Sequence, residues 1–275
     1  MSVLVTPQDL QDLRRDPTTV VIDVQYTLGG RPGRDDYDRA HIPGAHFVDL
    51  EAELSGAPGP GGRHPLPTAH SVQEALRRCG VDAGSTVVAY DAKTSLAAAR
   101  AWWVFRYFGL ADVRVLDGGL ERWRAEGLPT TTEYPTPGQG TFTARPGGLP
   151  MLDAEEAAEV AHTGILLDSR APERFRGETE PIDRVPGHIP GAVNAPMADY
   201  LRPDGRFLPV GQLRDYFAGK GVFEASSVGT SCGSGVTAAH EALALHEIGV
   251  QASVYVGSWS EWITDPSRPI ALGEA

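Results

Sequence analysis

One cysteine in a glycine-containing turn is the feature of this sequence that most directly suggests chemistry. The stretch 231–240 opens with the turn Ser-Cys-Gly-Ser-Gly, follows a predicted strand end at 227–230 and precedes a predicted helix at 241–245. Such a turn can point backbone N–H groups at one atom, and the helix dipole favours negative charge there. It would therefore favour the thiolate of Cys232 and make the sulfur a nucleophile. The alternative is a small buried cysteine beside a tight turn.

Cysteine usage indicates where the chain works. The sequence has two cysteines, Cys79 and Cys232. Such sparse use predicts a reducing compartment and a thiol kept for chemistry rather than for disulfides. Cys79 falls near the end of a predicted amphipathic helix at 71–79, where we expect it to be inert. The N-terminus lacks a signal-peptide pattern and no apolar run would span a membrane, so we expect a cytoplasmic protein.

Charge and composition make some classes of binding partner and cofactor unlikely. The 275 residues carry a net charge of −12, which disfavours nucleic acid and anionic membranes as general partners. Local arginines could still receive an anionic small molecule. No Cys/His group has the spacing of a zinc site, and no glycine-rich loop has a phosphate-binding pattern. We therefore predict no metal and no organic cofactor.

Strands and helices are predicted to alternate along the first half of the chain. Short β-branched runs bounded by Pro and Gly predict buried strands, and longer segments predict helices, one of them with Ser71 as its capping residue. The order is helix 7–15, strand 19–24, helix 71–79, strand 86–90, helix 95–108 and strand 113–116. This alternation predicts an α/β fold with a mostly parallel sheet flanked by helices.

The second half repeats the order of the first. His-Ile-Pro-Gly-Ala occurs at 41–45 and again at 188–192, and the strand at 20–23 matches 165–168. The repeat predicts two tandem α/β domains, at 1–128 and 151–275, joined by a Pro/Gly/Thr-rich linker at 129–150.

The repeat also separates the two domains by chemistry. Ligands of parallel sheets bind beyond the carboxyl ends of the strands, and the Cys232 turn has such a position. Its counterpart in the first domain is Asp91, which cannot accept sulfur, so the first domain is predicted to be non-catalytic. His41 and His188 occur in both halves and are therefore expected to be structural.

The tandem units, the repeated His-Ile-Pro-Gly-Ala and the single Cys-Gly-Ser-Gly-Val-Thr turn resemble the tandem rhodanese-domain sulfurtransferases over nearly the whole chain. The turn is most similar to that of 3-mercaptopyruvate sulfurtransferases. Thiosulfate-specific rhodaneses carry Arg and Lys after the cysteine, where this chain has Gly233 and Ser234. The resemblance implies two rhodanese-like domains and a persulfide on Cys232. It also implies a small-molecule sulfur donor, and a thiol acceptor such as a thioredoxin, or cyanide.

The resemblance also assigns roles to individual residues. Cys232 would accept sulfur, the backbone of the turn would form the substrate cradle, two arginines would bind substrate, and a Ser-His-acid relay would move a proton. The spacing around the second arginine, and a glutamate where aspartate is usual, depart from the family pattern. The residues concerned are Gly233, Gly235, Val236 and Thr237 (cradle), Arg174 and Arg184 (substrate), and Ser234, His64 and Glu51 (relay).

The sequence also allows purely structural roles for these residues and other functions for the chain. The arginines could form solvated salt bridges, and His64 and Glu51 could lie in surface loops. The chain could be a thiosulfate:cyanide sulfurtransferase, or a non-catalytic rhodanese-like binding module, although a module need not keep the cysteine. Phosphatases of the same fold need an arginine six residues after the cysteine, where this chain has Ala238. Because Gly233 and Ser234 supply no cation, we expect 3-mercaptopyruvate to be preferred over dianionic thiosulfate.

Overall fold

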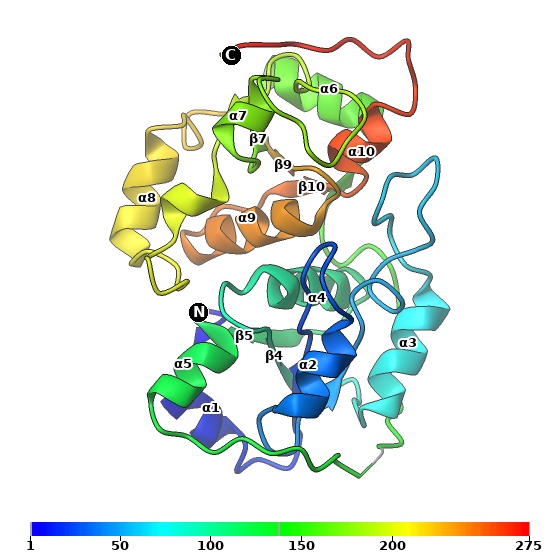
Figure 1. The fold of residues 1–275 in the computed structure, drawn as a ribbon, viewed down its shortest axis with the longest axis vertical. Helices are drawn as coiled ribbons and strands as arrows, with labels where there is room; N and C mark the ends of the chain where they lie inside the picture. The colour runs from blue at the N-terminus through cyan, green and yellow to red at the C-terminus, as the bar shows by residue number, and fades with distance from the viewer. Residues whose placement is uncertain (1, 137, 275) are drawn as a thin grey trace. The chain divides into compact units, whose positions relative to one another are not determined.

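The computed structural model describes residues 2–136 and 138–274, which form two compact units (Figure 1). Unit 1 comprises the chain up to Gly56, Pro67–Leu149 and Pro203–Arg206. Unit 2 comprises Ala57–Leu66, Pro150–Arg202 and the chain from Phe207 onward. Each unit therefore includes a short segment from the other half of the sequence, which we call the 57–66 segment and the 203–206 segment. Residues 129–149 of the predicted linker belong to unit 1.

Unit 1 is a five-stranded parallel sheet in the order β1-β5-β4-β2-β3, with helices on both sides (Figure 1). The central strand β4 is apolar and buried over most of its length because both of its faces are covered. Its elements are β1 (Leu4–Val5), α1 (Pro7–Leu13), β2 (Thr19–Asp23), α2 (Gly33–Arg39), β3 (His46–Phe47), α3 (Ala69–Arg78), β4 (Thr86–Tyr90), α4 (Leu96–Tyr107), β5 (Asp112–Leu116) and α5 (Gly119–Ala125).

Unit 2 repeats this plan with strand order β6-β10-β9-β7-β8, again all parallel. The predicted α/β class, with two parallel sheets flanked by helices, is confirmed. Its elements are β6 (Met151–Leu152), α6 (Ala154–Thr163), β7 (Ile165–Asp168), α7 (Pro172–Phe175), β8 (Val193–Asn194), the 3-10 helix η1 (Met197–Tyr200), α8 (Val210–Ala218), β9 (Val228–Ser231), α9 (Val236–Glu247), β10 (Ser253–Tyr255) and α10 (Ser258–Trp262).

The start of α3 differs from the sequence prediction. Thr68, not Ser71, is the capping residue: its side chain accepts the backbone N–H of Ser71 at 3.1 Å. Thr68 has the extended backbone of a capping position, whereas Ser71 lies inside the first helical turn. At the other end of α3, Cys79 is the buried capping residue.

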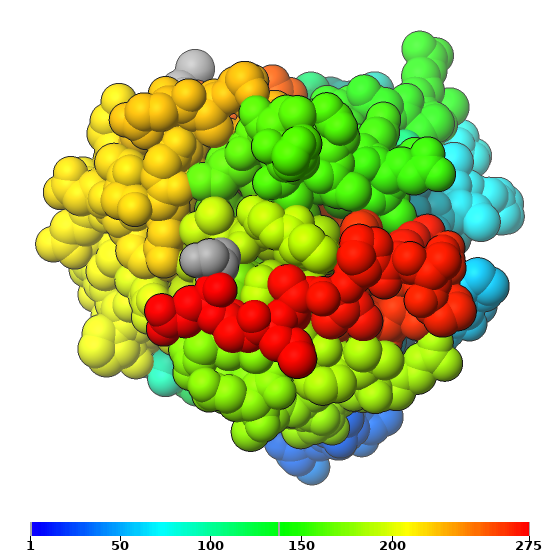
Figure 2. Space-filling model, turned by 90° about the horizontal axis from the view of Figure 1, so that it is seen from above, coloured from blue at the N-terminus to red at the C-terminus, as the bar shows by residue number. Residues whose placement is uncertain are grey.

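The repeated histidines have matching structural roles. His41 stacks on Tyr37 with 3.8 Å between ring centroids, and its Nδ1 lies 2.8 Å from the Tyr37 carbonyl oxygen. His188 does the same with Phe175, at 3.7 and 2.7 Å. The backbone of His188 also pairs with Ala271 in both directions at 3.0 Å. Figure 2 shows the resulting path of the C-terminal segment, in red, across the surface of unit 2.

None of the helices in the described ranges is both long and apolar enough to cross a membrane.

Candidate active site

The cysteine turn lies where the central strand of the unit 2 sheet is followed by the largely buried helix α9. Cys232 directly follows β9, which pairs with β7 on one side and β10 on the other, and α9 begins four residues later at Val236. Gly235 makes the sharp turn possible, with a φ of 81°. A Cβ at this position would lie 2.1 Å from the carbonyl oxygen of Val256, so only glycine fits.

Two backbone N–H groups point at the sulfur of Cys232. The Sγ atom accepts the N–H of Gly235 at 3.1 Å and that of Ser234 at 3.4 Å. The residue is 2 % exposed, so little water competes for the sulfur. Converging amides stabilise negative charge on an atom without placing a full cation beside it. The turn is therefore built to hold a thiolate, which is the form that attacks as a nucleophile.

The start of α10 holds the turn in this shape. The backbone N–H groups of Trp259 and Ser260 donate to the carbonyl oxygens of Cys232 and Gly233 at 3.0 and 2.9 Å. With its carbonyl groups held on α10, the turn keeps its own N–H groups directed at the sulfur.

Ser258 also supports the cysteine, although it was not predicted from the sequence. Its Oγ accepts the backbone N–H of Cys232 at 3.1 Å and lies 3.9 Å from Sγ. The φ of Ser258 is 51°, a left-handed conformation that costs a non-glycine residue on the order of 1–3 kcal/mol. The matching residue of unit 1 is Gly119, with a φ of 56°. A serine opposite a glycine in the repeat was the signal that could have identified this position.

Ser234 and His64 are in direct contact. The Nδ1 of His64 lies 2.8 Å from the Oγ of Ser234, and both residues are buried. His64 belongs to the 57–66 segment. The backbone N–H of Arg63 holds this segment in place by donating to the Oγ of Ser260 at 3.0 Å. Within unit 2 the expected relay thus comprises Ser234 and His64. Glu51 belongs to unit 1, where it lies exposed after β3, and its part in the relay stays a prediction.

The two predicted substrate arginines differ in their surroundings. Arg174 comes from α7, and its guanidinium nitrogens lie 3.6 and 3.7 Å from where a Cβ on Gly233 would be. Arg184 is exposed, and its Nη2 donates to the carbonyl oxygen of Ile263 at 2.6 Å. The structure therefore places Arg174 over the cysteine turn and gives Arg184 no such contact among the atoms nearest to Gly233.

Arg63, which was not predicted, lies beside Arg174 at this place. Its Nη2 is the atom nearest to a Cβ built on Gly233, at 3.3 Å. Its Nη1 forms an ion pair with Asp183 at 2.6 Å. A weak signal was available, because the Gly-Arg pair at 62–63 recurs as Gly205-Arg206 in the matching segment of the second half.

Comparison with known proteins identifies the family. The model of the rhodanese-like domain matches the chain twice, at residues 6–126 and 152–265.

The chain belongs to the rhodanese family.

Relatives extend over almost the full length of this rhodanese. It is 43 % identical over 281 residues to "Putative thiosulfate sulfurtransferase SseB" of Mycobacterium tuberculosis, covering 99 % of this chain and 98 % of the relative. It is 44 % identical over 282 residues to "Probable 3-mercaptopyruvate sulfurtransferase" of Pseudomonas aeruginosa, covering 98 % of each. The crystal structure of SseA from Escherichia coli, described as a 3-mercaptopyruvate sulfotransferase, superposes with a TM-score of 0.84 at 33 % identity, covering 95 % of this chain and all of SseA. The predicted enzyme class, a sulfurtransferase, is confirmed.

The rhodanese turn of unit 1 is filled by the protein's own carboxylate. Asp91 directly follows β4, as Cys232 follows β9. Its carboxylate accepts the N–H groups of Lys93 and Ser95 at 3.0 Å and of Ala97 at 2.9 Å. The turn is one residue longer than in unit 2, since α4 begins at Leu96. Unit 1 therefore keeps the anion cradle of the fold but occupies it with aspartate, which cannot carry sulfur.

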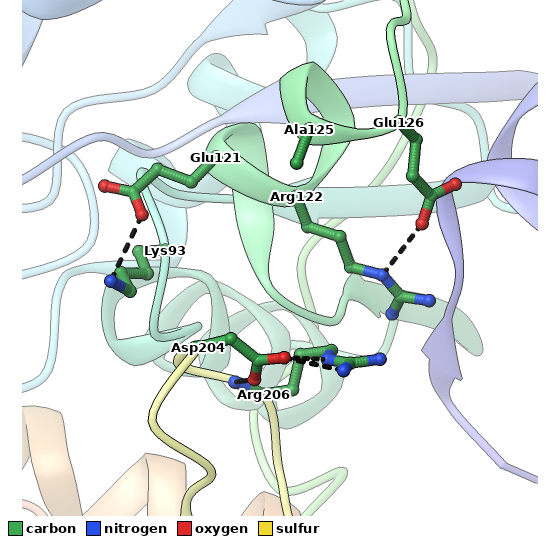
Figure 3. Close-up of a pocket in the computed structure, with 7 residues that line it drawn as sticks. All are labelled: Lys93, Glu121, Arg122, Ala125, Glu126, Asp204 and Arg206. Carbon is green, nitrogen blue, oxygen red and sulfur yellow. Dashed lines mark hydrogen bonds and ion pairs between the residues drawn. The ribbon is translucent and has the colours of Figure 1, made fainter.

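A cavity of about 320 Å³ lies beside this turn in unit 1 (Figure 3). Figure 3 shows that its cations point at acids of the same cavity: Lys93 pairs with Glu121 at 3.2 Å, Arg122 with Glu126 at 3.1 Å, and Arg206 with Asp204 at 2.6 Å. With each of these cations paired and Asp91 in place of cysteine, we assign no sulfur chemistry to this cavity.

Proposed function

We propose that this rhodanese moves sulfane sulfur from 3-mercaptopyruvate, through a persulfide on Cys232, to a thiol acceptor or cyanide, and releases pyruvate. The observation that carries the proposal is the pair of N–H groups, from Ser234 and Gly235, directed at the buried Sγ. Relatives named for 3-mercaptopyruvate and for thiosulfate support sulfur transfer in general.

In the first half-reaction the Cys232 thiolate attacks the sulfur of 3-mercaptopyruvate. The Sγ–S bond forms, the S–C bond of the donor breaks, and its electron pair becomes the enolate of pyruvate. The enolate carbon then takes a proton from water or through the Ser234–His64 pair, whose 2.8 Å contact can pass one. Arg174 would bind the donor carboxylate through charge-assisted hydrogen bonds.

In the second half-reaction the outer sulfur of the persulfide passes to an acceptor thiol, such as that of a thioredoxin, or to cyanide. The Cys232 thiolate is restored when the S–S bond breaks. Because donor and acceptor react in turn with one cysteine, the kinetics should follow a double displacement.

The Ser234–His64 pair favours 3-mercaptopyruvate over thiosulfate as donor. Pyruvate leaves as an enolate that must be protonated, whereas sulfite leaves thiosulfate as a stable anion and needs no proton relay. The names of the relatives do not choose between these donors, since they include both. Thiosulfate sulfurtransfer is therefore the second candidate, and a cation beside the turn, Arg63, is the observation that keeps it open.

The test is kinetic. The wild-type chain is assayed with each donor and cyanide, following pyruvate from 3-mercaptopyruvate and sulfite from thiosulfate. We expect kcat/KM to be at least tenfold higher for 3-mercaptopyruvate. Equal use of both donors would overturn the donor assignment. A folded chain that releases neither product would overturn the proposed sulfurtransferase activity and favour a non-catalytic binding module.

A further inference from the structure

We infer that Arg63, rather than Arg184, is the second substrate-binding arginine of this enzyme, and that Arg63 and Arg174 together hold the anionic group of the sulfur donor over Gly233. The inference rests on the proposed function, since it concerns the donor that reacts with Cys232. It assigns a specificity-determining role to the 57–66 segment, which comes from the half of the sequence that does not contain Cys232.

Two guanidinium groups converge on the space above Gly233. The Nη2 of Arg63 lies 3.3 Å, and the Nη2 and Nη1 of Arg174 lie 3.6 and 3.7 Å, from the position of a Cβ on this glycine. The backbone of Gly233 is not in the left-handed region, so a side chain would be conformationally allowed there. The missing side chain therefore leaves room between two cations, one residue from the nucleophile.

Asp183 holds the two like charges together. Its Oδ1 accepts the Nη1 of Arg63 at 2.6 Å, and its Oδ2 accepts the Nη2 of Arg174 at 3.2 Å. The Asp183 side chain is 3 % exposed, so the bridge is shielded from water and from salt. Arg174 is steadied further by Glu180 at 2.7 Å. The bridge fixes both guanidinium groups before the donor arrives, which reduces the ordering cost of binding.

Donor capacity is left on both arginines. The Nη1 of Arg174 has no hydrogen-bond partner within the described ranges, and neither has the buried Nε of Arg63. A carboxylate or a sulfonate-like group above Gly233 would face the unpaired edge of Arg174. Arg184 lines the same groove as Arg63 and Asp183, but its Nη2 is used on the Ile263 carbonyl oxygen, and it is not among the atoms nearest to Gly233.

The 57–66 segment cannot easily shift Arg63 away. Gly62 has a φ of 98°, and a Cβ there would lie 2.8 Å from the carbonyl oxygen of Gly257, so the segment packs tightly on the start of α10. The backbone N–H of Arg63 donates to Ser260, and the next residue, His64, contacts Ser234. The position of the guanidinium is thus set by contacts that do not depend on substrate.

The test compares matched arginine variants. Arg63→Gln, Arg63→Lys, Arg174→Gln and Arg184→Gln are assayed with both donors, with Arg206→Gln as the control, because Arg206 is the counterpart of Arg63 in unit 1. We expect Arg63→Gln to lower donor kcat/KM by about ten- to a hundredfold, the range of a hydrogen-bonded charge contact, mainly through KM. The loss should be larger for dianionic thiosulfate, and Arg63→Lys should recover part of it. Arg184→Gln and Arg206→Gln should stay within threefold of wild type.

A second measurement separates donor binding from catalysis and from folding. In the Cys232→Ser chain, which cannot react, calorimetric titration with 3-mercaptopyruvate should show weaker binding after Arg63→Gln but not after Arg184→Gln. Transfer from preloaded persulfide to a neutral dithiol should be unchanged by Arg63→Gln. Unchanged donor kinetics and binding in Arg63→Gln, or the larger loss in Arg184→Gln, would overturn the inference while leaving the enzyme intact. A wild-type chain that uses neither donor would overturn the proposed function and this inference with it.

Discussion

The Nδ1 of His64 lies 2.8 Å from the Oγ of Ser234, although 170 positions separate them in the sequence. The contact joins the 57–66 segment to the turn whose N–H groups face the sulfur of Cys232. Both side chains are buried, so the pair is shielded from bulk water. An imidazole with a hydroxyl in this position can hold and deliver a proton next to the reacting sulfur.

We predict that removing this pair affects one donor more than the other. His64→Gln or Ser234→Ala should lower kcat for 3-mercaptopyruvate by about a hundredfold, the lower range for a lost general acid. The rate with thiosulfate should fall far less, because sulfite needs no proton to leave. The measurement is kcat for both donors, with the exposed His70→Gln on α3 as the control. Equal losses for the two donors would show that the pair does not act as a proton relay.

We predict that the serine at position 258 lowers the stability of unit 2 but raises activity. Ser258→Gly removes the strain of a serine at a φ of 51°, so the melting temperature of unit 2 should hold or rise. The same change removes the Oγ that accepts the Cys232 N–H at 3.1 Å, and kcat/KM should fall by roughly tenfold, the effect of about one lost hydrogen bond. Ser258→Ala should lose activity without the gain in stability. Full activity in both variants would mean that the hydroxyl only fills space.

Asp23 should make stability depend on pH. Burial raises the pKa of Asp23 to about 7. Its hydrogen bonds with Tyr90 and Gln25 lower the pKa, but by less than burial raises it. Its counterpart Asp168 is instead paired with Arg170 at 2.6 Å. Because the folded state keeps the Asp23 proton up to about pH 7 and the unfolded state releases it near 3.8, the free energy of unfolding should decrease as pH rises between these values.

Denaturant unfolding of the wild type and of Asp23→Asn, at pH 5 and pH 8, checks this prediction. The wild type should lose up to about 1.4 kcal/mol per pH unit within the window, and Asp23→Asn should lose much less. The exposed Asp35→Asn should behave like the wild type. A wild-type chain that is as stable at pH 8 as at pH 5 would contradict the raised pKa.

The sequence predicted the sheets and the cysteine turn for identifiable reasons. Strands such as β4 and β7 are continuous apolar runs, because parallel strands are buried on both faces. The repeat of His-Ile-Pro-Gly-Ala fixed the two-unit plan, since each histidine closes the same loop. The Cys232 turn was recognisable from its glycines, because the tight backbone at Gly235 tolerates no other residue.

Three features were not predictable in the same way: Arg63, Ser258 and the assignment of the 57–66 segment to unit 2. The segment is rich in Pro and Gly and has no periodicity, so its sequence does not indicate where it packs. The partner of Arg63, Asp183, is 120 residues away, and no local pattern signals such an ion pair. The left-handed φ of Ser258 arises from the junction of β10 with α10, whereas serine itself has no preference for that conformation.

In the proposed mechanism, Cys232 alone carries the sulfur. Cys79 offers a matched internal control, because its burial raises its pKa to about 12 and keeps it a thiol. In Cys232 the N–H groups of Ser234 and Gly235 face the sulfur instead. The two cysteines therefore differ in chemistry while both are buried.

The most direct measurement is peptide mass spectrometry of the chain after treatment with 3-mercaptopyruvate without acceptor, together with activity of Cys232→Ser and Cys79→Ser. We predict the added mass of one sulfur atom on the Cys232 peptide, none on the Cys79 peptide, no activity in Cys232→Ser and near-normal activity in Cys79→Ser. Sulfur found on Cys79, with activity surviving in Cys232→Ser, would contradict the account.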